Sequence, residues 1–284
     1  MFHPDGPTLA ELLHQALVDT TEGYDLIAPK FDYTPFRTPD ALLEQFFERV
    51  AQHGEVEREL DVCCGTGAAT AHLRRLCTQE VVGVDLSQGM LDQARARLEA
   101  QQDATTPFDF GQRNALEMTF ERPFDLAVCF GAFGHILPED QDRFIRRIYD
   151  ALAPGGRFVF ITRHDPSPLE RTFWVYRGFN AAMRVRNALI KPPFIMYYLI
   201  FTLPRALEVL TRQGFQVQVE AGLSDLRQVL LHRPVRVAAV GQVAHAPVGL
   251  VDLKVHRDLS RSDGVGYGGV SQPADSRKAG KRRN

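Results

Sequence analysis

Two short segments hold the residues best suited to ligand chemistry, LDVCCGTGAAT at residues 60–70 and EVVGVDL at residues 80–86. Gly65 and Gly67 let a backbone turn approach a ligand closely, because glycine has no Cβ. Asp85 lies next to the end of the second segment, about twenty residues after these glycines. An acid at that distance is placed to accept hydrogen bonds from ribose hydroxyls. Together the two segments predict a site for a nucleoside-containing cofactor.

The same loop lacks the features of two common nucleotide sites. A nicotinamide dinucleotide site would show G-x-G-x-x-G, which lets the backbone approach a pyrophosphate. A nucleoside triphosphate site would show Gly-Lys-Ser/Thr for the terminal phosphates and their magnesium. Neither pattern is present, and the first basic residue after the glycines is Arg74. The sequence therefore favours a nucleoside ligand of another kind.

The first segment resembles the opening motif of class I S-adenosylmethionine-dependent methyltransferases, usually close to L-D-x-G-C-G-T-G. Later segments are similar to the family's successive strands and helices, in the family's order, at residues 81–95, 111–120, 124–136, 152–162 and 203–222. The resemblance covers roughly Tyr24–Val240 and is closest to the small-molecule branch that methylates ubiquinone and menaquinone precursors. It implies an α/β fold, a Rossmann-like doubly wound sheet of seven mostly parallel strands with helices on both faces.

The resemblance also implies a set of cofactor contacts. Asp61 and the glycine turn are expected to hold the methionine part, and Asp85 the ribose. Phe130 and Gly131 are expected to pass beneath the sulfonium. The implied contacts are Tyr24, Asp61, Cys63, Gly65, Gly67, Asp85, Leu86, Met90, Asn114, Ala115, Phe130 and Gly131. Some of these residues also have a purely structural alternative role. Leu86, Met90 and Phe130 could simply pack in the core, Asp85 could cap a helix, and Tyr24 could be an aromatic staple.

Two positions depart from the family pattern. Cys63 stands where glycine is usual, so we expect a backbone there that is not left-handed. Asn114 stands where aspartate often precedes alanine. Both departures leave open a protein that binds the cofactor without transferring its methyl group.

The candidate general base is His135, which follows the predicted fourth strand. His164, after the predicted fifth strand, is a second candidate at the same ligand-binding edge. Histidine titrates near neutrality, so either side chain is suited to proton removal. A hydrogen-bonded or surface histidine is the alternative, because some methyl acceptors need no base. CFGAFG replaces the Asn/Asp-Pro-Pro-Tyr/Phe of the amide-methylating DNA enzymes, which argues against nucleobase acceptors.

The chain divides by its patterns into an N-terminal helical cap (1–55), a methyltransferase domain (56–241) and a basic tail (242–284) expected to be disordered. Tyr24–Asp40 is aromatic and broken by prolines, so an ordered cap without regular structure is expected. Residues 163–203 form an insertion expected to be a substrate lid. Within it Thr172–Ile190 is expected to be helical, and Phe194–Leu203 to be a buried helix, a lid or a peripheral membrane contact.

Composition narrows the function further. The 284 residues are 44% hydrophobic and 24% charged, with net charge −2, which gives no general reason to expect a nucleic-acid partner. The four cysteines lack metal-ligand spacing, so no metal is expected. Residues 1–5 show no basic-then-apolar pattern, and no run is long enough to span a bilayer, so a cytoplasmic location is expected.

The expected function is transfer of a methyl group from S-adenosylmethionine to an apolar or aromatic small molecule, with O-, N- and C-methylation all open. The alternatives are a non-catalytic cofactor-binding scaffold and a protein or RNA methyltransferase.

Overall fold

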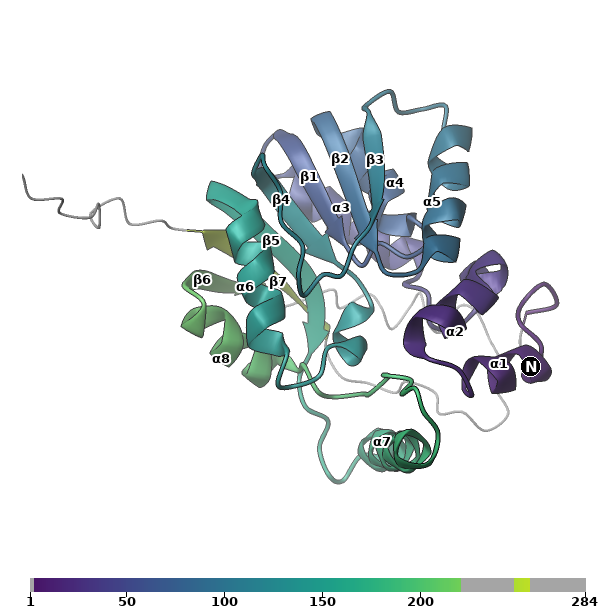
Figure 1. The fold of residues 1–284 in the computed structure, drawn as a ribbon. Helices are drawn as coiled ribbons and strands as arrows, with labels where there is room; N and C mark the ends of the chain where they lie inside the picture. Colours follow the sequence, from purple (N-terminus) through teal and green to yellow (C-terminus); the bar gives the residue numbers. More distant parts are fainter. Residues whose placement is uncertain (1–2, 221–247, 256–284) are drawn as a thin grey trace, which may run out of the picture.

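The computed structural model describes residues 3–220 and 248–255, which form a seven-stranded sheet in the order β3-β2-β1-β4-β5-β7-β6 (Figure 1). Strands β1 to β5 are parallel to one another, whereas β7 runs antiparallel between β5 and β6. The strands are β1 (Val56–Val62), β2 (Cys77–Asp85), β3 (Phe108–Gln112), β4 (Phe124–Cys129), β5 (Leu152–Arg163), β6 (Phe215–Glu220) and β7 (Val248–Val255).

Helices cover both faces of the sheet, because the central strands are apolar on both sides. One face packs on α6 (Gln141–Ala151) and α8 (Leu203–Arg212) through a core that includes Leu60 and Phe144. The other packs on α3 (Asp40–Ala51) and α4 (Ala68–Leu76), with α5 (Gln88–Ala100) beside them. The predicted Rossmann-like, mostly parallel architecture is confirmed.

The strand order reverses between β1 and β4. The chain moves outward from β1 through β2 to β3 and then returns to β4 on the other side of β1. Ligands of open α/β sheets bind at such a switch point, outside the carboxyl ends of the strands. The residues that follow β1, β2, β3 and β4 all reach this edge, and they include most of the predicted cofactor contacts.

The N-terminal segment is helical and lies beside the carboxyl ends of β1 and β2 (Figure 1). It forms α1 (Leu9–Gln15), α2 (Thr20–Ile27) and the 3-10 helix η1 (Ala28–Tyr33) before α3. The expectation that Tyr24–Asp40 has no regular element is therefore wrong for its first ten residues. Asp19 caps the N-terminus of α2, and Pro29 sits in the first turn of η1, where it is tolerated.

Strand β7 changes the predicted domain boundary. It hydrogen-bonds to both β5 and β6 although it lies within the expected tail, so the sheet extends to Val255 and the boundary at 241 is wrong. The rest of the expected tail, 256–284, lies outside the described residues.

The insertion contains one helix instead of two. The predicted first helix is α7 (Arg171–Leu189), but residues 190–202 follow an irregular path, so the helical interpretation of Phe194–Leu203 is wrong. We call residues 190–202 the strap. In the described part of the chain, no helix is long and apolar enough to cross a membrane.

Candidate functional site

The turn after β1 is built from three left-handed residues, Cys63 (φ 58°), Gly65 (φ 54°) and Gly67 (φ 73°). The expectation that Cys63 avoids this conformation is wrong. The Cys64 N–H extends the β1–β2 pairing by donating to the Val84 carbonyl at 3.0 Å, and this fixes the path through residue 63. The Cys63 backbone is thus held in a region that side chains with a Cβ rarely occupy.

The two glycines of the turn have different roles. A Cβ on Gly67 would lie 2.9 Å from the Ala94 Cβ of α5, so this glycine allows α4 and α5 to pack closely. A Cβ on Gly65 would meet nothing within 4 Å, and the same holds for Gly131 after β4. The open space at Gly65 and Gly131 is where a bound group can approach the backbone.

Asp85 ties the turn after β1 to the end of β2. Its Oδ2 accepts from the Gly65 N–H at 2.9 Å, and its Oδ1 accepts from the Ser87 N–H at 2.9 Å. Burial raises the Asp85 pKa above its ordinary value, against the lowering effect of these backbone donors. A carboxylate oxygen has two lone pairs, so each retains one for a further donor. These two acceptor oxygens fit the two hydroxyl groups of a ribose.

Asp61 lies deeper than predicted. Its carboxylate is buried, and Oδ2 accepts from the Thr70 hydroxyl of α4 at 2.6 Å. Burial raises the Asp61 pKa to about 7, and the Asp85 charge adds to the effect. The side chain therefore changes ionisation near neutrality, where a cationic ligand group would favour the charged form.

The predicted adenine contacts differ in accessibility. Leu86 is 46% exposed at the ligand edge. Met90 is buried against Ile27 and Ala28 of the N-terminal segment, as core packing would place it. The Asn114 Oδ1 accepts from the Leu116 N–H at 3.0 Å, shaping the loop after β3, and Ala115 is buried.

Two acids missed by the sequence analysis fasten the N-terminal segment over this edge. Asp25 Oδ1 accepts from the Gly89 N–H at 2.8 Å and from the Ser87 hydroxyl at the start of α5. Asp32 accepts from the Thr66 hydroxyl at 2.7 Å in the glycine turn. Asp25 directly follows Tyr24, a predicted cofactor contact, and this position next to Tyr24 was the one feature of the sequence that could have indicated its role.

Tyr24 and His135 form a hydrogen-bonded pair at 2.9 Å between the Tyr24 hydroxyl and His135 Nε2. His135 Nδ1 contacts the Ile195 carbonyl, which only accepts, so Nδ1 carries the proton and Nε2 receives the Tyr24 O–H. Burial lowers the His135 pKa below its ordinary range. The imidazole is therefore neutral at physiological pH, with its basic nitrogen directed at Tyr24.

The elements around this pair explain its position. Gly131, with φ 73°, begins the 3-10 helix η2 (Ala132–His135), which presents His135. Burial raises the Tyr24 pKa, and the Asp85 charge raises it further.

Two other predicted residues lie apart from this pair. Phe130 packs against Phe46 of α3, with ring centroids 4.7 Å apart. The alternative base His164 is exposed after β5.

The strap covers the Tyr24–His135 pair from the other side. The Phe194 ring stacks on Tyr24 with centroids 6.3 Å apart, and the Tyr197 N–H donates to the Gly134 carbonyl at 2.8 Å. On α7, Tyr176 stacks on Tyr198 of the strap, with ring centroids 4.7 Å apart. Trp174 of the same helix is 63% exposed.

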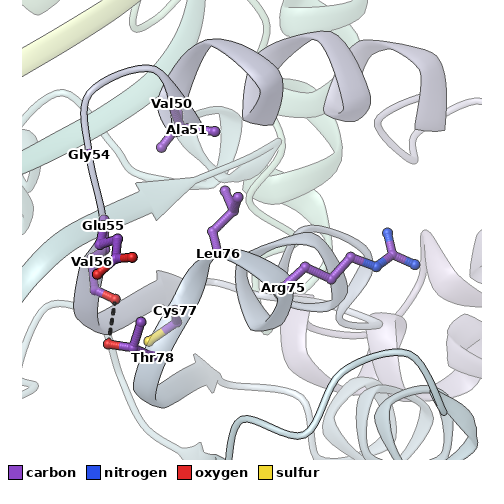
Figure 2. A pocket seen from close by; sticks show the side chains of 9 residues that line it. All are labelled: Val50, Ala51, Gly54, Glu55, Val56, Arg75, Leu76, Cys77 and Thr78. Atoms are coloured by element: carbon purple, nitrogen blue, oxygen red, sulfur yellow. Dashed lines mark hydrogen bonds between the residues drawn. The ribbon is translucent and has the colours of Figure 1, made fainter.

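A cavity of about 390 Å³ lies at the opposite edge of the sheet (Figure 2). It is lined by the last turn of α3 and by the starts of β1 and β2, including Val56 and Cys77. Cys77 and Asp85 are the two ends of β2, about 26 Å apart along an extended strand. This cavity is therefore separate from the candidate site.

Comparison with known proteins agrees with this geometry. Residues 60–156 match the family described as methyltransferase domain. The chain is 35% identical to a demethylmenaquinone methyltransferase of Lactococcus lactis over 121 residues, 41% of this chain and 47% of that protein. It is 32% identical to that of Thermus thermophilus over 174 residues, 58% of this chain and 76% of the relative.

The fold also matches a solved structure, the phosphoethanolamine N-methyltransferase 2 of Haemonchus contortus in complex with S-adenosyl-L-methionine. The TM-score is 0.56 and the identity 20%, covering 84% of this chain and 58% of that one. The chain spans about half the length of the first curated relatives it matches. It belongs to the class I S-adenosylmethionine-dependent methyltransferase superfamily, in the branch of the demethylmenaquinone methyltransferases.

Proposed function

We propose that this protein transfers a methyl group from S-adenosylmethionine to an apolar or aromatic small-molecule acceptor, with His135 as the base. The observation that carries the proposal is the 2.9 Å hydrogen bond between Tyr24 and His135, covered by the strap. Family membership supports the cofactor. Asp85 would hold the ribose, the open backbone at Gly65 would accept the methionine part, and Asp61 would face its ammonium group.

When bound, the cofactor supplies an electrophilic methyl group on a positively charged sulfur. The chain then has to hold the acceptor in line, exclude water and take up a proton. An acceptor hydroxyl or amine that replaces the Tyr24 hydroxyl at Nε2 gives its proton to that nitrogen. The Ile195 carbonyl keeps the Nδ1 proton and stabilises the resulting imidazolium.

The acceptor class follows from the covering residues. In the strap, Phe194 stacks on Tyr24, and the Tyr197 backbone bonds to Gly134 beside His135. Tyr198 of the strap packs on Tyr176 of α7. Aromatic walls with few polar groups favour a flat, apolar ring. The curated relatives are named demethylmenaquinone methyltransferases, which makes a naphthoquinol the first acceptor to test.

The test uses tritiated methyl donor, the full protein and either a demethylated naphthoquinol or a cell extract separated into small-molecule, protein and nucleic-acid fractions. Label is expected in the small-molecule fraction, and His135→Gln should lower kcat by about 100-fold or more. Tyr33→Phe and His164→Gln are matched controls, because both side chains are exposed. Label mainly in protein or nucleic acid would refute the acceptor class. Cofactor binding without transfer to any fraction would support the scaffold alternative.

A further inference from the structure

Helix α7 exposes several of its large apolar side chains to solvent. Its two buried side chains, Thr172 and Asn187, are both polar. Trp174, Val185 and Leu189 are 63%, 59% and 78% exposed. A helix at a protein–water boundary normally turns its apolar side to the core. The outer side of α7 is therefore suited to a surface less polar than water.

The inner side of α7 is joined to the strap by hydrogen bonds from two asparagines. Asn187 and Asn180, seven residues apart and so on one side of the helix, each bond twice to the strap backbone. Asn187 pairs with the N–H and carbonyl of Phe194 at 2.9 Å, and Asn180 pairs with those of Tyr198 at 2.8 Å. Arg186 donates to the Ala16 carbonyl between α1 and α2 at 2.7 Å. Tyr176 and Phe179 also pack on Tyr198 of the strap, so the helix is attached without using the exposed apolar residues Trp174, Val185 and Leu189.

The outer side combines apolar and basic residues. Its exposed positions hold tryptophan, valine, leucine, alanine, glycine and arginine, and none holds an acid. At about 100° per residue, Trp174, Ala181 and Val185 lie within roughly 40° of one another around the helix. Arg177 and Arg184 follow one border of this strip. Arginines bordering an apolar strip extend their charge to the headgroup level of a membrane.

The charge of α7 identifies the partner. The helix carries four arginines and no Asp or Glu, a charge of +4, in a chain whose net charge is −2. We propose that α7 lies in the interface of an anionic lipid membrane, with Trp174 and Val185 among the acyl chains and Arg177 and Arg184 at lipid phosphates. Leu9 and Leu13 of the neighbouring α1 are also exposed, at 67% and 58%. Lipid binding goes beyond the proposed methyl transfer and does not depend on it.

Trp174 is the one tryptophan of the chain, so its fluorescence reports on this helix alone. The full protein is mixed with vesicles of phosphatidylcholine, or of phosphatidylcholine with phosphatidylglycerol. We expect sedimentation with the phosphatidylglycerol vesicles, a blue shift of the Trp174 emission and quenching by brominated lipids. Salt should weaken the binding, because the arginines act through charge.

Variants separate this surface from other sources of lipid affinity. Val185→Glu and Arg177→Glu should each reduce vesicle binding by about tenfold or more. The matched controls Val219→Glu on β6 and Arg146→Glu on α6 should bind like wild type, since both side chains are exposed elsewhere. Calorimetric titration with S-adenosylhomocysteine should be unchanged in all four variants, which keeps this test separate from that of methyl transfer.

Vesicle binding retained by Val185→Glu, or unquenched Trp174 in bound protein, would overturn the proposal. A dimer in light scattering that Val185→Glu dissociates, without vesicle binding by the wild type, would overturn it in favour of an interface between copies of the chain.

Discussion

The backbone N–H of Gly65 donates a 2.9 Å hydrogen bond to the carboxylate of Asp85. The turn after β1 and the acid at the end of β2 are therefore already joined by a hydrogen bond before any ligand binds. Because a preformed site loses less entropy on binding, this bond should contribute to cofactor affinity as well as to local stability.

Asp85→Ala removes an acceptor from the Gly65 and Ser87 N–H groups and from the expected ribose. We expect it to weaken S-adenosylhomocysteine binding by about 1–3 kcal/mol, measured by titration calorimetry. Asp109→Ala, an exposed acid on β3, is the control and should bind like wild type. An Asp85→Ala protein with unchanged affinity would show that the ribose is held elsewhere.

Asp61 predicts a pH dependence of stability. Its pKa is about 7 in the folded protein and ordinarily 3.8, so the folded state binds a proton that the unfolded chain releases. Stability from this group is full below pH 3.8 and is lost as the pH rises through 7. Asp61→Asn cannot ionise and should raise the free energy of unfolding at pH 8 by on the order of 3 kcal/mol, but little at pH 4. Equal effects at both pH values would contradict the assignment.

Glu59 should change the pH dependence of stability in the same direction as Asp61. It is buried on β1 two residues before Asp61, and within the described chain neither of its carboxylate oxygens is hydrogen-bonded. Burial raises its pKa well above the ordinary value, and the Asp61 charge adds to this. Glu59→Gln should therefore stabilise the protein as the pH rises. Because the two acids interact, chemical denaturation of the double variant with Asp61→Asn should give a non-additive change in unfolding free energy.

Alanine at the two glycines of the turn should have different effects. Gly67→Ala places a Cβ 2.9 Å from Ala94 and should lower the thermal midpoint strongly. Gly65→Ala meets open space, so its cost should be limited to the left-handed strain of roughly 1–2 kcal/mol. Gly65→Ala should instead weaken S-adenosylhomocysteine binding. A Gly65→Ala protein that binds the ligand normally would show that the ligand does not approach this backbone.

Asn187 anchors the strap, and its removal should loosen the cover of the site. Asn187→Ala leaves the buried N–H and carbonyl of Phe194 without this partner, at a cost of about 1–3 kcal/mol. We expect lower kcat and faster proteolysis within residues 190–202, with S-adenosylhomocysteine affinity changed only a few-fold. Gln79→Ala, which removes an exposed amide on β2, is the control. Loss of cofactor affinity would make the strap part of the cofactor site.

The sequence was sufficient for the parallel strands and for the positions of the glycine turn and Asp85 at their carboxyl ends, because apolar runs, glycine turns and strand-end acids are local signals. It was insufficient where the determining partner is distant. The apolar run after Pro193 reads as a helix, yet Asn180, Asn187 and Thr20 bind its backbone groups in an extended path. The tautomer of His135 depends on the Ile195 carbonyl, 60 residues later.

Arg186 links the insertion to the N-terminal segment by hydrogen bonds. Its guanidinium donates to the Ala16 and Val18 carbonyls from α7, across about 170 residues of sequence. The same N-terminal segment carries Tyr24 and Asp25, which contact His135 and the start of α5. We therefore expect a displacement of α7 to reach the residues over the candidate site. Amide hydrogen exchange at residues 16–27 and at residues 186–198 should accordingly speed up together, so that the two segments behave as one opening unit.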